Sequence, residues 1–149
     1  MRAVVQRVAR GRVTVGERVT GEVARGLLVY LGVGAGDDEA AARYLVEKVA
    51  TLRVFEDDRG RMSLDVTAVG GALLVVPQFT LFGDVRSGRR PDFTGAMEPV
   101  RANALYEDFV AGLRARGLTV ATGEFRAEMQ VESVNDGPVT LLVDSARQF

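Results

Sequence analysis

Two continuous apolar runs, Gly26–Val33 and Ala72–Pro77, place the strongest constraint on how this chain can fold. Each has the length of a strand, and neither shows the alternation of apolar and polar residues that marks a half-exposed strand. Both are far too short to cross a bilayer as helices. We therefore expect two buried strands at the centre of a sheet, with the second strand beginning at Gly70.

Weaker patterns define the elements around these runs. A helix is expected over Asp37–Val54, with Asp37 as its N-cap and a buried stripe that includes Leu45 and Val49. A second helix is expected to begin at Glu98-Pro99 and to end at Gly117. Further strands are predicted at Arg2–Val8, Val13–Val15, Val19–Val23, Arg53–Phe55, Leu118–Ala121, Arg126–Val134 and Val139–Val143, and a long loop at Gly83–Ala96.

The order of these elements predicts the fold class. Strands outnumber helices and the connections are short, which favours an α+β fold with a mostly antiparallel or mixed sheet. A chain of 149 residues and 16.0 kDa fits one domain, spanning residues 1–149. A domain of this size buries about 70% of its unfolded surface, so it needs neither metal nor disulfide to be stable.

The composition excludes several kinds of chemistry. The chain has no histidine and no cysteine, so it can form neither a Ser-His-Asp triad, nor a thiol nucleophile, nor a typical zinc site. Its net charge of −1 argues against a long nucleic-acid interface, so any such contact should involve a few nucleotides at most. Arginines interrupt the residues after Met1, so we expect no export signal, no membrane partner and a cytoplasmic location.

Two other patterns could suggest a bound ligand. The glycines in Gly32–Gly36 lack the spacing of a phosphate-binding or dinucleotide-binding loop, and a turn before a helix explains them better. Asp57-Asp58 and Asp136 match no calcium-loop pattern, and a solvated turn is the simpler interpretation. We therefore expect no metal and no cofactor.

Two short segments remain as candidates for a site. Pro77–Leu81 follows the second apolar run; it can be an amphipathic strand with Gln78 and Thr80 on one side, or a strand end whose amides face a substrate. Asn135–Thr140 contains Asp-Gly between two predicted strands, which is a strong hairpin signal. Its Gly137-Pro138 pair offers only backbone carbonyls.

Together these two segments resemble the paired signature of the D-aminoacyl-tRNA deacylases, in which a Ser/Pro-Gln-Phe-Thr-Leu segment and a Gly-Pro-Val-Thr segment build one site. The similarity covers almost the entire chain. Other matching segments are Val5–Val8, Gly26–Val29 through Val33, Gly88–Phe93, Thr122-Gly123 with Phe125, and Met129–Val131.

The resemblance implies a homodimer that hydrolyses the ester of D-aminoacyl-tRNA, or of glycyl-tRNA, at the tRNA 3′ end. It also implies a mixed sheet that curls toward a barrel, with two main helices. Gly137 and Pro138 should form a cis peptide whose carbonyls enter the partner's site and reject an L-amino acid, whereas glycine has no side chain to reject. Arg7 should support this Gly-Pro turn, unless it forms only a surface salt bridge.

The resemblance also assigns roles around the ester. The amides of Phe79 and Thr80 would stabilise the oxyanion, because such intermediates need preorganised donors. Pro77 has neither hydroxyl nor N–H, so it can be neither nucleophile nor oxyanion donor. Without a histidine base to activate Thr80, we expect Gln78 and Thr80 to position the substrate while the terminal ribose 2′-hydroxyl assists hydrolysis.

Two further groups of residues near the predicted site each have two interpretations. Phe125 and Met129 match residues associated with the terminal adenine, but they also suit a core stripe. Arg86, Arg89 and Arg90 could neutralise phosphates near the acceptor end, or could lie in a solvated loop. Two alternatives to the deacylase are a binder of tRNA 3′ ends without turnover and a related deacylase with relaxed chirality.

Overall fold

The centre of the sheet consists of two parallel strands, β3 (Gly26–Gly32) and β6 (Ala72–Pro77), in the computed structural model, which describes all 149 residues. The strand order is β2-β1-β3-β6-β7, and β8 pairs with the free side of β1. The other elements are β1 (Arg2–Val15), β2 (Arg18–Val23), α1 (Glu39–Ala50), β4 (Phe55–Glu56), β5 (Met62–Leu64), the 3-10 helix η1 (Phe79–Phe82), α2 (Pro99–Ala115), β7 (Val120–Thr122) and β8 (Gln130–Asp144).

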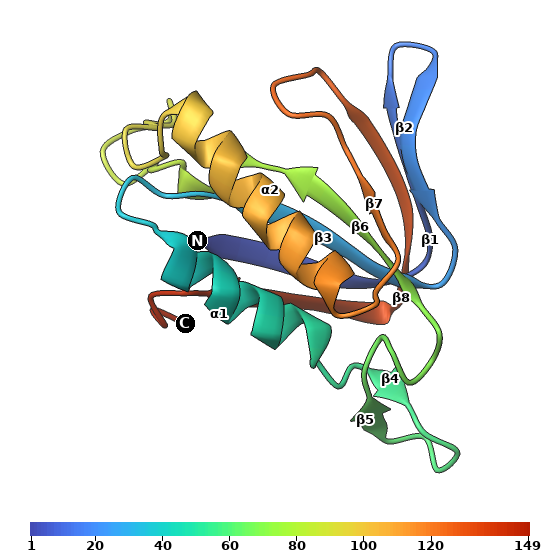
Figure 1. The fold of residues 1–149 in the computed structure, drawn as a ribbon. Coiled ribbons are helices and arrows are strands. Elements are labelled where there is room, and N and C mark those ends of the chain that lie inside the picture. The colour runs from blue at the N-terminus through green and yellow to red at the C-terminus, as the bar shows by residue number, and fades with distance from the viewer.

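Both faces of β3 and β6 are buried, which explains why their sequences do not alternate. Figure 1 shows α1 and α2 side by side on one face of the sheet. Leu27, Val29 and Leu31 of β3 belong to the large core beneath the helices. Leu28, between them, belongs to a smaller core on the opposite face. The two predicted central strands are confirmed.

The smaller core lies inside the curl of the sheet. Gly21 of β2 approaches the backbone of β7 so closely that a Cβ at this position would lie 2.5 Å from the Thr122 oxygen. The two ends of the strand order therefore almost meet, and the mixed sheet is nearly closed into a barrel. Six buried residues fill its interior: Val8, Val13, Val23, Leu28, Leu74 and Val76.

The two helices follow the predicted pattern, with two corrections. The first helix ends at Ala50 rather than at Val54. Asp38, rather than Asp37, caps α1, because its carboxylate accepts a hydrogen bond from the Ala41 amide. The Asp37 carboxylate instead forms an ion pair with the Met1 amine and accepts a hydrogen bond from the Gly34 amide. Proline at the first turn of α2 and the left-handed glycine after its end agree with the predicted boundaries. No helix is long and apolar enough to cross a membrane.

The predicted division of the first strand is wrong. Arg2–Val8 and Val13–Val15 belong to one continuous strand of 14 residues, β1. On one edge of β1, the first part of the strand pairs with β3 and the last part pairs with β2. On the other edge, β8 pairs with nearly the whole length of β1. The change of partner around Ala9–Arg12 explains why the pattern there resembled a break.

The predicted hairpin at Asn135-Asp136-Gly137 is also wrong. The segments before and after it both pair antiparallel with β1, so they are parts of the single strand β8. Asn135 is paired with Val8 and Thr140 with Gln6, which leaves residues 136–139 bulged opposite Arg7 alone. The Gly137-Pro138 bond within this bulge is cis. An Asp-Gly signal marks a local turn, but it does not show whether the chain then reverses.

The side chain of Arg7 stabilises this bulge. Its side chain is 7% exposed and lies 3.1 Å from the Asp136 carboxylate, and its Nε donates to the Asp136 carbonyl oxygen. Its Nη1 donates to the Val54 carbonyl oxygen at 2.6 Å. One guanidinium therefore links the bulge to the segment that follows α1. Asn135 completes the bulge by accepting from the Val139 amide and donating to Thr140 Oγ1.

Replacing Arg7 by methionine should destabilise the fold, because the buried Val54 carbonyl loses its donor. We expect the free energy of unfolding to fall by about 1–3 kcal/mol, measured by urea denaturation as a lower midpoint. The matched control is Arg10→Met on the same strand, since Arg10 is exposed and forms no ion pair. Equal midpoints for the two variants would contradict a structural role for Arg7.

Candidate functional site

A pocket of about 600 Å³ opens at the carboxyl edge of the three parallel strands β3, β6 and β7. This edge is a common place for ligand sites, because strand ends and the loops that follow them converge there. The lining is mostly apolar. Its residues include Pro77, Gln78 and Phe79 from the end of β6, and Phe125, Arg126 and Met129 from the loop between β7 and β8.

The segment after Pro77 is a short 3-10 helix and not the amphipathic strand that alternation suggested. The Leu81 amide donates to the Gln78 carbonyl, and the Gly83 amide donates to the Thr80 carbonyl. Four residues are too few to separate the two periods, so the sequence pattern was ambiguous here. The turn brings the two polar side chains together, and Gln78 Nε2 donates to Thr80 Oγ1.

The start of this helix leaves backbone donors available. Amides in the first turn of a helix have no partner within the helix, and Phe79 and Thr80 occupy that turn. Phe79 is 58% exposed, and its ring packs edge-to-face on Phe93 with 5.0 Å between the ring centroids. Thr80 is exposed beside Gln78 and is not among the lining residues.

Phe125 and Met129 bring the loop between β7 and β8 to the pocket. The Phe125 ring lies 6.1 Å from the Tyr106 ring, and Met129 Sδ accepts a hydrogen bond from the Glu124 amide. Gly123 makes room for this sulfur, since a Cβ there would lie 2.7 Å from it. Both residues therefore line the pocket, and Phe125 also packs against the edge of the large core.

Tyr106 is a pocket residue that the sequence did not reveal as one. It lies on α2 next to the buried Leu105, so helical spacing alone places it on the buried face of the helix. Its hydroxyl donates to the Val75 carbonyl at 2.9 Å, and burial raises the pKa of Tyr106 well above its ordinary value. The hydroxyl therefore stays protonated and fixes the end of β6 to the helix.

The structure separates the predicted site residues into two groups. Pro77, Gln78, Phe79, Phe125 and Met129 surround the pocket, with Thr80 adjacent. The second group, Arg7, Gly137 and Pro138, is absent from the pocket lining of the same chain. Gly137 and Pro138 are exposed on the bulge of β8.

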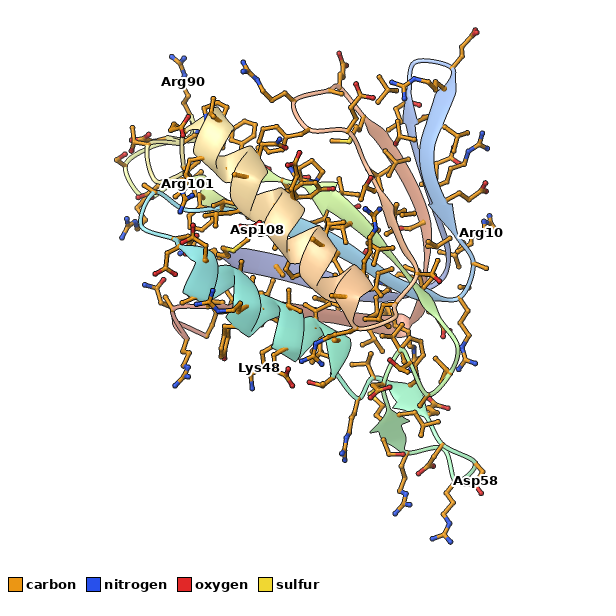
Figure 2. The ribbon with its side chains drawn as sticks, in the orientation of Figure 1. Arg10, Lys48, Asp58, Arg90, Arg101 and Asp108 are labelled. Atoms are coloured by element: carbon orange, nitrogen blue, oxygen red, sulfur yellow. The ribbon has the colours of Figure 1, made fainter.

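The three arginines of the long loop differ in their surroundings. Arg86 forms an ion pair with Asp84, and its hydrogen bonds lower the pKa of Asp84 to about 2. Arg89 and Arg90 form no ion pair, and Figure 2 shows Arg90 pointing away from the body of the molecule. Of the three loop arginines, Arg86 therefore has an acidic partner, whereas Arg89 and Arg90 have none.

Two of the acidic residues considered as metal ligands, Asp57 and Asp136, have other partners. The Asp57 carboxylate accepts hydrogen bonds from the Arg59 and Arg61 amides and from Ser63, which closes the turn between β4 and β5. Asp136 is paired with Arg7. The structure contains no group of three or more His, Cys, Asp or Glu residues that could hold a metal ion. The turn interpretation of Asp57 is confirmed.

Comparison with known proteins agrees with the geometry. A sequence model of the family described as D-Tyr-tRNA(Tyr) deacylase matches residues 4–144. The chain is 59% identical over 149 residues to a D-aminoacyl-tRNA deacylase of Koribacter versatilis (strain Ellin345), and the match covers all of both chains.

Two solved structures have the same fold. One is described as c-Myc DNA Unwinding Element Binding Protein, with a TM-score of 0.91, 40% identity and coverage of 97% of this chain and 98% of that one. The other is a probable eukaryotic D-amino acid tRNA deacylase, with a TM-score of 0.85, 20% identity and coverage of 96% and 98%, and this likeness concerns the fold alone. Because the family match spans almost the entire sequence, the chain belongs to the D-Tyr-tRNA(Tyr) deacylase family.

Proposed function

We propose that this chain is a cytoplasmic hydrolase that cleaves the ester between a D-amino acid and the 3′ end of tRNA. The observation that carries the proposal is the pocket beside Pro77–Thr80, in a chain 59% identical to a D-aminoacyl-tRNA deacylase over its full length. The apolar lining suits an aromatic amino acid and a nucleobase. Phe125 and Met129 would contact the terminal adenine.

Ester hydrolysis passes through an oxyanion, which needs donors already in place. The amides of Phe79 and Thr80 at the start of η1 are suited to this task, because the helix itself does not use them. Pro77 contributes no donor, so it serves as a fixed wall at the strand end.

The proton of the attacking water needs an acceptor. The chain has no histidine, no carboxylate lines the pocket, and the Tyr106 hydroxyl stays protonated. The terminal ribose 2′-hydroxyl lies next to the ester in the substrate itself and can take part in proton transfer. Gln78 and Thr80, which are hydrogen-bonded to each other, would then position the substrate.

Replacing that ribose with its 2′-deoxy form should therefore slow hydrolysis of D-Tyr-tRNA by about 10²–10⁴-fold, the usual contribution of a proton-transfer group. The measurement is single-turnover hydrolysis with tRNA ending in adenosine or in 2′-deoxyadenosine. Unchanged rates would reject assistance by the ribose and would make Thr80 Oγ1 the leading candidate for a nucleophile.

Selection between enantiomers is proposed to come from Gly137 and Pro138 of a partner subunit. In one chain these residues are exposed and lie outside the pocket, so a second copy is needed to bring them to the ester. Their carbonyls would obstruct the side chain of an L-amino acid. Glycine has no side chain to obstruct, so glycyl-tRNA should also be hydrolysed.

This arrangement requires a homodimer. Sedimentation equilibrium should give twice the 16.0 kDa mass of the chain at the concentrations used for activity assays. A monomer that still hydrolyses the D-ester selectively would contradict the shared site, because it could not receive a carbonyl pair from a second copy.

The function itself is tested with three substrates under identical conditions. D-Tyr-tRNA and Gly-tRNA should be deacylated. The rate for L-Tyr-tRNA should be lower than that for D-Tyr-tRNA by a factor of about 100 or more, given the usual strength of steric discrimination. Binding of the D-ester without turnover would favour a carrier of tRNA ends instead. Equal hydrolysis of both tyrosyl esters would favour a deacylase with relaxed chirality.

A further inference from the structure

Arg126 is the only charged residue that lines the pocket. The lining has two other polar side chains, Gln78 and Tyr106, and each already has a partner: Gln78 donates to Thr80, and Tyr106 donates to the Val75 carbonyl. Arg126 forms no ion pair, although Glu124, two residues before it, is paired with Arg18 at 2.5 Å. The pocket therefore contains one uncompensated positive charge.

The backbone of Arg126 has a conformation that is unfavourable for arginine. Its φ angle is 63°, in the left-handed region that costs a residue with a Cβ about 1–2 kcal/mol. Glycine would adopt this conformation without that cost. The turn is closed by the hydrogen bond from the Ala127 amide to the Glu124 carbonyl, so Arg126 is held at its apex. An arginine at such a position points to a role for its side chain.

Arginine's planar guanidinium binds phosphate and carboxylate groups through paired hydrogen bonds. In the substrate of the proposed function, on which this inference rests, the amino acid carboxyl is esterified and the free α-amine is cationic. Unless the amino acid itself is acidic, the anions nearest the ester are the phosphodiesters of the tRNA end. Arg126 lines the pocket and is exposed to solvent. It can therefore reach the part of the tRNA strand that extends out of the pocket.

We propose that Arg126 binds the phosphodiester that joins the terminal adenosine of the tRNA to the preceding nucleotide. The terminal nucleoside and its ester would occupy the apolar pocket, and the phosphate would lie on the guanidinium at the rim. Arg126 is then a substrate-positioning residue that sets how far the 3′ end enters. The contact is local, in keeping with a chain whose net charge is −1.

The test compares two substrates that differ in phosphate. D-Tyr-tRNA has the phosphodiester, and 3′-O-D-tyrosyladenosine ends at the ribose. Arg126→Gly should raise KM for D-Tyr-tRNA about tenfold, the usual scale for one charged hydrogen-bonding contact, with kcat unchanged because the contact is remote from the ester. Both constants for D-tyrosyladenosine should stay at their wild-type values. Arg126→Lys should show a smaller rise in KM.

Arg147→Gly is the matched control. Arg147 also has a left-handed backbone, with φ of 55°, but its guanidinium lies over Tyr44, and it does not line the pocket. Both glycine variants relieve the same kind of backbone strain, so a general effect on stability would appear in both. Only the Arg126 variant should change KM. Arg126→Gly should also reduce the slope of log KM for D-Tyr-tRNA against log salt concentration by about 0.7, the value for one phosphate of a single strand.

Equal loss on both substrates would overturn the proposal, because Arg126 would then act on the nucleoside or the amino acid. No loss on either substrate would overturn it as well. Binding of the trinucleotide CCA, measured by titration calorimetry, reads the same contact without turnover and should weaken about tenfold in Arg126→Gly. If the wild-type protein hydrolyses neither ester, the proposed function fails, while the CCA titration still decides the role of Arg126.

Discussion

Burial of both faces of the β3–β6 pair is the constraint on which the rest of the structure depends. One face needs the two helices, and the other needs the sheet to curl until β2 approaches β7, where Gly21 permits close contact. The pocket follows from the same arrangement. The carboxyl ends of three adjacent parallel strands lie at one edge of the curled sheet, and α2 covers that edge, with the Tyr106 hydroxyl donating to the Val75 carbonyl of β6. A stable core and a substrate-sized cavity therefore have a common origin.

The site has few side chains that could perform acid or base chemistry. Its polar groups are mostly backbone amides and side chains that are bonded to one another, as Gln78 is to Thr80. Such a site can orient a reactive ester and stabilise developing charge without supplying a strong base. That division of labour suits a substrate with its own hydroxyl beside the bond to be broken. In the proposed reaction, the fit of the nucleotide in the pocket would matter as much as any single side chain.

Much of the fold could be predicted from the sequence, because long apolar runs and a helical stripe such as Leu105, Phe109 and Leu113 report burial directly. Local signals succeeded less well where pairing partners decide the outcome. The Asp-Gly pair at 136–137 marked a turn, yet only the pairing of both flanks with β1 shows that the chain continues in the same direction. Tyr106 and Arg126 escaped notice for a related reason, since their place in the pocket depends on which elements lie opposite them.

Strand β8 connects the two parts of the proposed site in a single rigid element. Val131 lines the pocket near its start, and Asn135 begins the bulge, about 13 Å further along at 3.3 Å per residue. Val131 and Asn135 are both paired with residues of β1. The distance between the pocket of a chain and the Gly137-Pro138 bulge of the same chain is therefore fixed by the sheet, whereas a loop between them would let it vary. The strand works as a fixed spacer. In a symmetric pair of chains, the separation of the two active sites would then be set by strand geometry, and both sites would be aligned by the same docking event.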